Sequence, residues 1–125
     1  MQKLLINGKK ELSGTISISG SKNATLPILA ASILSHQVKL KNIPLVKDIS
    51  TMLELLKFIG LTTYLDKKKN VIEITNINKN IKTLAPYNLV KTMRAGVLVL
   101  GPLLAKYKKA KISLPGGCAI GTRPV

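Results

Sequence analysis

The segment from Lys22 to Ser35 limits the possible folds more than any other part of the sequence. It opens directly after Gly20-Ser21, and its apolar residues fall on most sides of a helix rather than along one stripe. A helix that is apolar nearly all round has to be buried on most of its surface. The apolar members are Leu26, Ile28, Leu29, Ala30, Ala31, Ile33 and Leu34. We therefore predict a deeply buried helix, kinked or restarted at Pro27, with other elements arranged around it.

Alternating strand and helix patterns fill the rest of the chain. Two-residue alternation and turn residues predict strands at 3–7, 14–19, 37–42 and 111–114 and a hairpin of 61–66 with 71–75. Further helices are predicted from Asp48, as N-cap, to Phe58 or Ile59, with Gly60 as the stop, and from about 86–88 to 107. The second helix has an apolar face of Met52, Leu55, Leu56 and Ile59. This order indicates an α/β or α+β fold without linkers or a clear repeat.

The composition argues against several classes of protein. Of 125 residues, 46% are hydrophobic, which permits a packed core, and a net charge of +15 raises the question of nucleic acid. The lysines are scattered and only 3% of residues are aromatic, so a platform for stacked bases is not expected. The first ten residues lack a signal-peptide core, and the longest apolar run, 95–105, is too short to span a membrane. We expect a soluble cytoplasmic protein with no membrane or nucleic-acid partner.

Three segments carry residues suited to chemistry on anions. Lys22 and Asn23 open a helix, where free N–H groups favour anions, although a solvated lysine is the alternative. Lys91 and Arg94 would share a face of the third helix, with an exposed basic face as the alternative. Cys118 lies in the glycine-rich loop 115–124, either as a reactive thiol or as an incidental small residue.

The arginines fall within these segments. The chain has 18 lysines and only two arginines, Arg94 and Arg123, and both belong to the candidate segments. A planar guanidinium can bind a phosphate or carboxylate with two parallel hydrogen bonds, which an ammonium cannot do. This placement suggests that the two positions contact anionic groups.

The three segments together resemble one family, the UDP-N-acetylglucosamine enolpyruvyl transferases. The resemblance rests on Ser21-Lys22-Asn23-Ala24 and Leu26-Pro27-Ile28-Leu29, on 89–95 (LVKTMRA), and on 114–118 (LPGGC) with 121–125 (GTRPV). Their order and spacing agree along essentially the whole chain. The related enzyme that acts on shikimate 3-phosphate lacks the cysteine loop, so Cys118 favours the UDP-sugar enzyme.

The resemblance implies a reaction and a role for each site residue. The family transfers the enolpyruvyl group of phosphoenolpyruvate to the 3′-hydroxyl of UDP-N-acetylglucosamine by addition and elimination, releasing phosphate, without a metal or an organic cofactor. Cys118 matches the catalytic thiol acid, which is also the target of fosfomycin. Lys22, Asn23 and Arg123 match residues at phosphoenolpyruvate. The UDP-sugar contacts are matched by Asn23, Arg94, Arg123, Pro124 and Val125.

The resemblance also implies how the chain is organised. The family fold is two inside-out α/β domains with central helices and outer sheets. Residues 1–21 would form strands packed with the other domain, and 22–125 would form part of the first domain. The base for the sugar hydroxyl lies beyond residue 125 in the family, so we expect a fragment, a truncated gene product or half of a split enzyme. It would be inactive alone, with the C-terminal part of the enzyme as its partner. A basic nucleic-acid-binding module and an inactive remnant are the alternatives.

Overall fold

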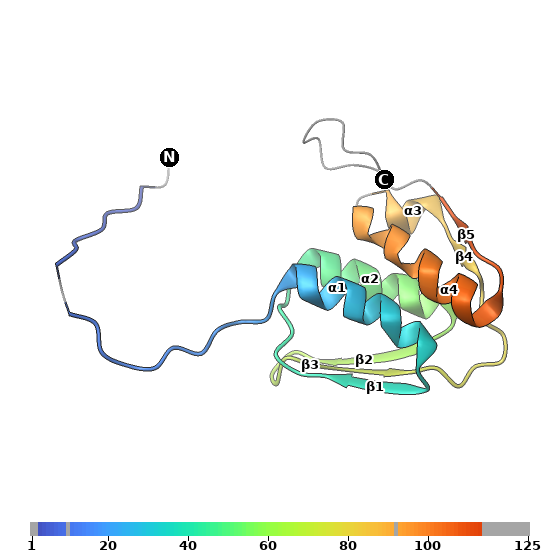
Figure 1. The fold of residues 1–125 in the computed structure, drawn as a ribbon, viewed down its shortest axis with the longest axis horizontal. Helices are drawn as coiled ribbons and strands as arrows, with labels where there is room; N and C mark the ends of the chain where they lie inside the picture. Colours follow the sequence, from blue (N-terminus) through green and yellow to red (C-terminus); the bar gives the residue numbers. More distant parts are fainter. Residues whose placement is uncertain (1–2, 10, 92, 114–125) are drawn as a thin grey trace.

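The computed structural model describes residues 3–9, 11–91 and 93–113 as a helical layer over a small sheet, preceded by an extended arm (Figure 1). The sheet has three antiparallel strands in the order β1-β3-β2: β1 is Gln37–Leu40, β2 is Thr62–Asp66 and β3 is Val71–Thr75. The predicted strand at 37–42 and the predicted hairpin are therefore confirmed. Ile72 and Ile74 of β3 are buried against the helices, while Tyr64 of β2 is exposed, so the other face of the sheet lies outward.

Helix α2, Lys47–Ile59, has the predicted core face. Met52, Leu55, Leu56 and Ile59 are completely buried. Gly60 ends the helix at a φ of 121°, a value that a glycine adopts without strain. The predicted N-cap is wrong. The capping residue is Val46, which makes no side-chain cap, and Asp48 lies inside the first turn.

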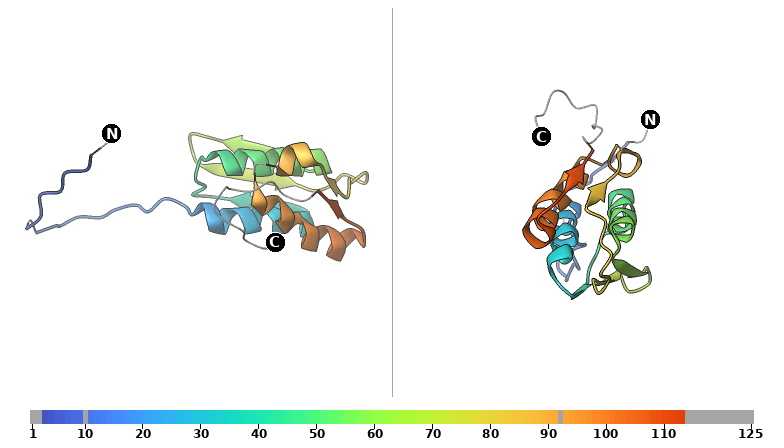
Figure 2. Two further views of the ribbon diagram at one scale, coloured as in Figure 1. Left: turned by 90° about the horizontal axis from the view of Figure 1, so that it is seen from above. Right: turned by 90° about the vertical axis from the view of Figure 1, so that its right-hand side faces the viewer.

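Helix α1, Lys22–Ala31, runs through Pro27 and continues as the 3-10 turn η1, Ser32–Leu34. It lies between α2 on one side and the later helices on the other (Figure 2). Leu26, Leu29 and Ala30 are buried there. Burial is nevertheless incomplete, because Ile28 is 48% exposed. The predicted deep burial is therefore wrong for the described residues, because they cover only one side of α1.

The predicted third helix is divided into three pieces, which is a correction. These are α3, Tyr87–Val90, the 3-10 segment η2, Arg94–Val99, and α4, Leu100–Tyr107. Met93 separates α3 from η2 with an extended backbone, at φ −137° and ψ 101°. The two short strands β4, Leu84–Ala85, and β5, Lys111–Ile112, flank this region and pair in parallel. The sequence predicts β5, as part of a longer strand at 111–114, but it does not predict β4.

The end of β3 is tied to the helices by Asn76. This side chain is buried, and its amide nitrogen donates to the carbonyl of Ile33 at 2.7 Å and to the hydroxyl of Tyr107 at 3.2 Å. Lys106 donates to the same carbonyl at 2.9 Å. Both lone pairs of the Ile33 oxygen are thus engaged, which joins α1–η1, β3 and α4 at one end of the molecule.

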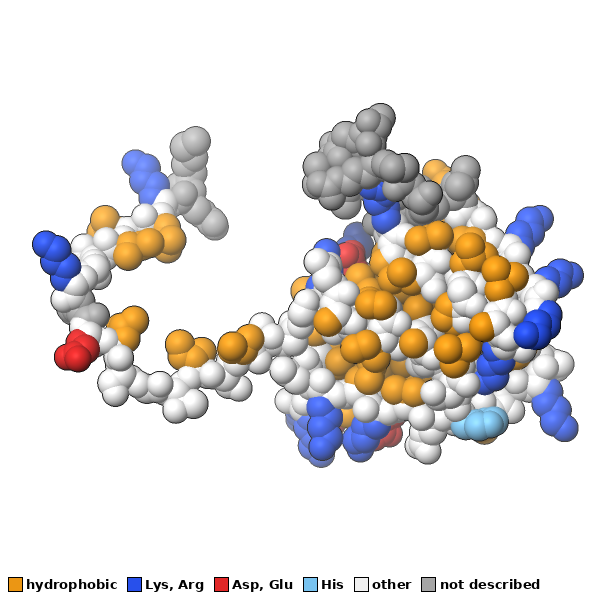
Figure 3. All heavy atoms as spheres, in the orientation of Figure 1, with side chains coloured by type: hydrophobic (Ala, Val, Ile, Leu, Met, Phe, Trp, Pro, Cys, Tyr) orange, Lys and Arg blue, Asp and Glu red, His pale blue; other side chains and the backbone are white. Residues whose placement is uncertain are grey.

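Apolar side chains gather on one face of the helical layer. In Figure 3 they cover α1 and α4, with lysines around the rim of that view. The large exposed apolar residues of these helices are Ile28, Leu34, Leu100 and Leu104. We call this surface the α1–α4 face. An apolar area of this kind is typical of a surface that another element covers.

The residues before α1 form an extended arm rather than the two predicted strands. The described positions 3–9 and 11–20 carry no strand assignment, and the arm leads away from the helical layer in Figure 1. Alternation alone does not make a strand, because the backbone groups need a neighbouring strand for their hydrogen bonds. The exposed apolar side chains of the arm are Leu4, Leu5, Ile6, Leu12, Ile16 and Ile18.

Candidate functional site

The chain enters α1 through a tightly fixed turn. The backbone N–H of Gly20 donates to the side-chain oxygen of Asn42 at 3.1 Å, and the Asn42 amide donates to the carbonyl of Ile18 at 3.3 Å. Ser21 caps the helix by accepting from the N–H of Ala24 at 3.4 Å. These contacts fix where the first turn of α1 begins, and therefore the starting point of the Lys22 side chain.

A depression of about 210 Å³ lies at the beginning of α1 and α2. Its lining residues come from α1, α2 and the junction between α3 and η2: Lys22, Asn23, Leu26, Asp48, Met93, Arg94 and Ala95. Both helices are long enough to present a positive end here, and their first-turn residues contribute to the lining. Lys22 and Arg94 add two full positive charges. The depression is therefore suited to an anionic group.

Lys22 and Asp48 form an ion pair inside this lining. The ammonium nitrogen of Lys22 lies 2.9 Å from a carboxylate oxygen of Asp48, and the two side chains are 49% and 35% exposed. Asp48 is the one carboxylate among the described lining residues. The sequence predicts it only as a helix cap, and no pattern in the sequence connects it with a lysine 26 positions earlier.

The structure brings together three of the predicted site residues. Lys22, Asn23 and Arg94 line one depression although Arg94 is far from the others in the chain. Lys91 does not join them. It is the exposed C-cap of α3, and the extended Met93 places it on a different element from Arg94, so the predicted shared face is wrong.

The remaining predicted site residues fall outside the described residues. These are Cys118, Arg123, Pro124 and Val125. Their predicted roles as thiol acid, phosphate ligand and nucleotide contacts stay predictions.

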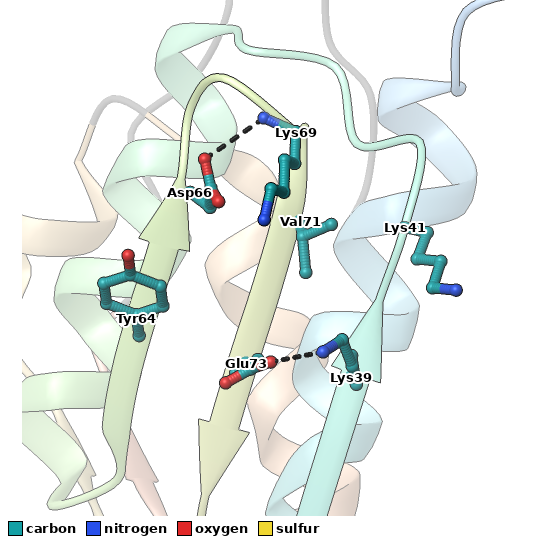
Figure 4. Close-up of a pocket in the computed structure, with 7 residues that line it drawn as sticks. All are labelled: Lys39, Lys41, Tyr64, Asp66, Lys69, Val71 and Glu73. Carbon is teal, nitrogen blue, oxygen red and sulfur yellow. Dashed lines mark hydrogen bonds and ion pairs between the residues drawn. The ribbon is translucent and has the colours of Figure 1, made fainter.

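A second depression lies on the outer face of the sheet, and both of its carboxylates have local partners (Figure 4). Glu73 pairs with Lys39 at 2.6 Å, and this hydrogen bond and charge raise the pKa of the Lys39 ammonium. Asp66 accepts from the backbone N–H groups of Lys68 and Lys69 at 3.0 and 3.1 Å. Lys41 points away from these groups in Figure 4. None of the predicted site residues lines this depression, whereas three of them line the depression at Lys22.

No helix among the described residues has the length and apolar character needed to cross a membrane.

Comparison with known proteins gives one consistent family. The model of the EPSP synthase (3-phosphoshikimate 1-carboxyvinyltransferase) family matches residues 6–125. Proteins named UDP-N-acetylglucosamine 1-carboxyvinyltransferase are similar over the whole chain: 61% identical in Pelagibacter ubique (strain HTCC1062), 55% in Cellvibrio japonicus (strain Ueda107) and 53% in Rickettsia prowazekii (strain Madrid E). The chain spans about 30% of the length of each of these relatives.

A solved structure shares the fold. The crystal structure of the enolpyruvyl transferase NikO from Streptomyces tendae matches 76% of this chain and 22% of its own, with a TM-score of 0.65 and 20% sequence identity. The mixed α/β class expected from the sequence is confirmed, and the fold is shared with that structure. With a family model that covers nearly all of its residues, the chain belongs to the EPSP synthase (3-phosphoshikimate 1-carboxyvinyltransferase) family.

Proposed function

We propose that this chain is the N-terminal part of an enzyme that transfers enolpyruvyl from phosphoenolpyruvate to the 3′-hydroxyl of UDP-N-acetylglucosamine. The main support is the convergence of Lys22, Asn23 and Arg94 on one depression, in a chain 53–61% identical to enzymes named for that transfer. The substrates carry phosphate and carboxylate groups, and the site offers two cations and two helix N-termini to hold them.

In the proposed mechanism the cations act on charge that moves during the reaction. The 3′-oxygen adds to C2 of phosphoenolpyruvate while a proton is delivered to its methylene carbon. The proton of the 3′-hydroxyl passes to a base in the rest of the enzyme. Elimination from the tetrahedral intermediate then breaks the bond between C2 and the phosphate oxygen and removes a proton from the new methyl group, which restores the double bond and releases phosphate. Lys22 binds the anionic groups of phosphoenolpyruvate, Asn23 lies near the sugar and the intermediate, and Arg94 contacts the UDP-sugar. Cations fixed before the reaction stabilise the departing phosphate without reorganisation.

The roles of the loop residues rest on the resemblance alone. Cys118 supplies the proton for the methylene carbon, Arg123 contacts both substrates near their phosphates, and Pro124 and Val125 begin the nucleotide-binding segment. We propose that the transfer uses neither a metal nor an organic cofactor. The product belongs to the first committed step of peptidoglycan synthesis, so the assembled enzyme would act in the cytoplasm, support cell shape and division, and be a target of fosfomycin.

The chain alone is proposed to be inactive because the family's base for the sugar hydroxyl lies beyond residue 125, and three of the five acids of this chain are engaged in other contacts. Asp48 is paired with Lys22 and Glu73 with Lys39, while Asp66 holds a turn. The exposed arm and the α1–α4 face support a further proposal, that residues 1–21 and the helices pack against the C-terminal part of the enzyme.

A chimera tests the proposed function directly. The 125-residue chain would replace the matching 30% of the Pelagibacter ubique relative, with which it shares 61% identity. We expect phosphate release that requires both phosphoenolpyruvate and UDP-N-acetylglucosamine, and none from the 125-residue chain by itself. Lys22→Ala should cost about 2–4 kcal/mol of transition-state stabilisation, whereas Lys109→Ala, an exposed lysine outside the site, should cost nothing measurable.

Mass spectrometry tests the cysteine separately. One fosfomycin adduct should form on Cys118 of the chimera, faster with UDP-N-acetylglucosamine bound. Cys118→Asp keeps an acid without the sulfur, so it should retain some turnover and resist the epoxide. Absence of an adduct under saturating sugar nucleotide would count against the proposed role of the loop.

A further inference from the structure

Asp48 occupies an unexpected position for a carboxylate in a site that attracts anions. It is the second residue of α2, and Val46 rather than Asp48 caps that helix. Its carboxylate lies in the lining shared with Lys22 and Arg94, and it reaches Lys22 at 2.9 Å. A negative charge there repels an anionic substrate unless it also improves the contact that a cation makes with that substrate.

Stability does not account for the pair. Both side chains are at least one-third exposed, and ion pairs in such positions contribute little to folding. The ends of the pair come from different helices, 26 residues apart in the chain, so it is not an incidental contact between neighbours on one helix. The ion pair therefore acts on the position of the Lys22 ammonium.

The chemistry of the ammonium allows both contacts at once. A lysine has four rotatable side-chain bonds and loses much conformational freedom when its head group is fixed in one place. It also carries three donors, so a Lys22 that donates to Asp48 can still donate to a phosphate or carboxylate. Asp48 thus fixes the ammonium before the substrate arrives, which reduces the entropy lost on binding.

We propose that Asp48 is a positioning residue, which acts through Lys22 to hold its ammonium where the anionic part of phosphoenolpyruvate binds. This inference rests on the proposed function. The effect of Asp48 on activity should then disappear when Lys22 is absent. A residue that only stabilises the start of α2 would keep its effect without Lys22.

A double-mutant cycle in the chimera tests the inference. Asp48→Asn keeps the size of the side chain and removes its charge, and it should lower kcat/KM for phosphoenolpyruvate about 3- to 30-fold. In a Lys22→Ala background the same substitution should change kcat/KM less than twofold. Asp48→Glu should recover part of the loss. Glu54→Gln is the matched control, since it removes one negative charge from an exposed position on the same helix, and it should leave kcat/KM unchanged.

The outcomes separate the inference from the proposed function. An equal loss from Asp48→Asn with and without Lys22 would overturn the positioning role, as would no loss in a chimera that Lys22→Ala impairs. A wild-type chimera without transfer activity would count against the proposed function. A titration of the 125-residue chain with inorganic phosphate, followed by the amide NMR signals of Asn23 and Arg94, would then decide the role of Asp48. Weaker binding in Asp48→Asn but not in Glu54→Gln supports it, and unchanged binding overturns it.

Discussion

Gly20 provides the most specific test of how the fold places Lys22. A β-carbon at this position would lie 1.8 Å from the backbone oxygen of Asn42 and 3.2 Å from the Cδ of Pro44. Real contacts of a β-carbon are essentially never shorter than 3.0 Å, so Gly20→Ala has to separate the two backbones by about 1.2 Å. The contact is with backbone, and no side-chain rotation can relieve it.

Gly20→Ala should cause a small loss of stability and a large loss of catalytic activity. The separation breaks the hydrogen bonds that join Asn42 to Gly20 and Ile18, both of them exposed, so the free energy of unfolding should fall by only about 1–2 kcal/mol. Lys22, two residues further on, would start from a displaced backbone. A misplacement of about 1 Å in a catalytic site can reduce the rate by about 100-fold. Gly20→Ala should therefore reduce activity far more than stability.

The assay compares two glycines before α1. Gly8 has no atom within 4 Å of the position that a β-carbon would take, so Gly8→Ala is the matched control. In the chimera we expect Gly20→Ala to lower kcat/KM for phosphoenolpyruvate by about 10- to 100-fold, while urea unfolding shows a loss of only about 1–2 kcal/mol. Equal kcat/KM for the two variants would refute the argument that this turn positions Lys22. A loss of stability above about 4 kcal/mol would show instead that the turn is essential for folding.

Three further predictions concern the unfolding and association of the 125-residue chain. Gly96→Ala should lower the free energy of unfolding, measured in urea, by about 1–3 kcal/mol, because its β-carbon would lie 2.6 Å from the side chain of Val90. Gly101→Ala, in an open position within α4, should instead raise the free energy of unfolding by about 0.5–1 kcal/mol. Asn76→Leu should lower it by about 1–3 kcal/mol, and an unchanged urea midpoint would show that its hydrogen bonds are dispensable. Ile28→Gln on the α1–α4 face should slow aggregation, measured by light scattering, with a change in stability within about 1 kcal/mol, and aggregation at the original rate would contradict the role of this face.

The sequence predicts those elements whose cause is local. The four apolar residues of α2 recur at helical spacing, and Gly60 ends the helix, so both the core face and its end are confirmed. The hairpin of β2 and β3 follows from two alternating runs around a short polar turn. In each case the residues that determine the structure lie close together in the sequence.

The structure differs from the prediction where contacts between residues far apart in the sequence determine the conformation. The third helix contains no strong breaker at Met93, yet the backbone is extended there, so Lys91 and Arg94 diverge. The arm has the alternation of a strand but no neighbouring strand among the described residues. For the site, the sequence singles out Lys22, Asn23 and Arg94 one by one, and the structure places them in the lining of one depression, while their roles stay predictions. The contribution of Asp48 depends on a contact between two helices, which the sequence does not encode locally.

The position of the site next to the α1–α4 face links assembly with binding. Lys22 and Asn23 form the first turn of α1, and Ile28 and Leu34 lie further along the same helix and its 3-10 extension, on the exposed apolar surface. A partner segment that covers this surface would also fix the axis of α1, and with it the direction in which the helix N-terminus and the Lys22 side chain point. The candidate anion site and the packing surface therefore share helix α1, so under the proposed function the binding of substrate and the packing of a partner segment would each favour the same placement of α1.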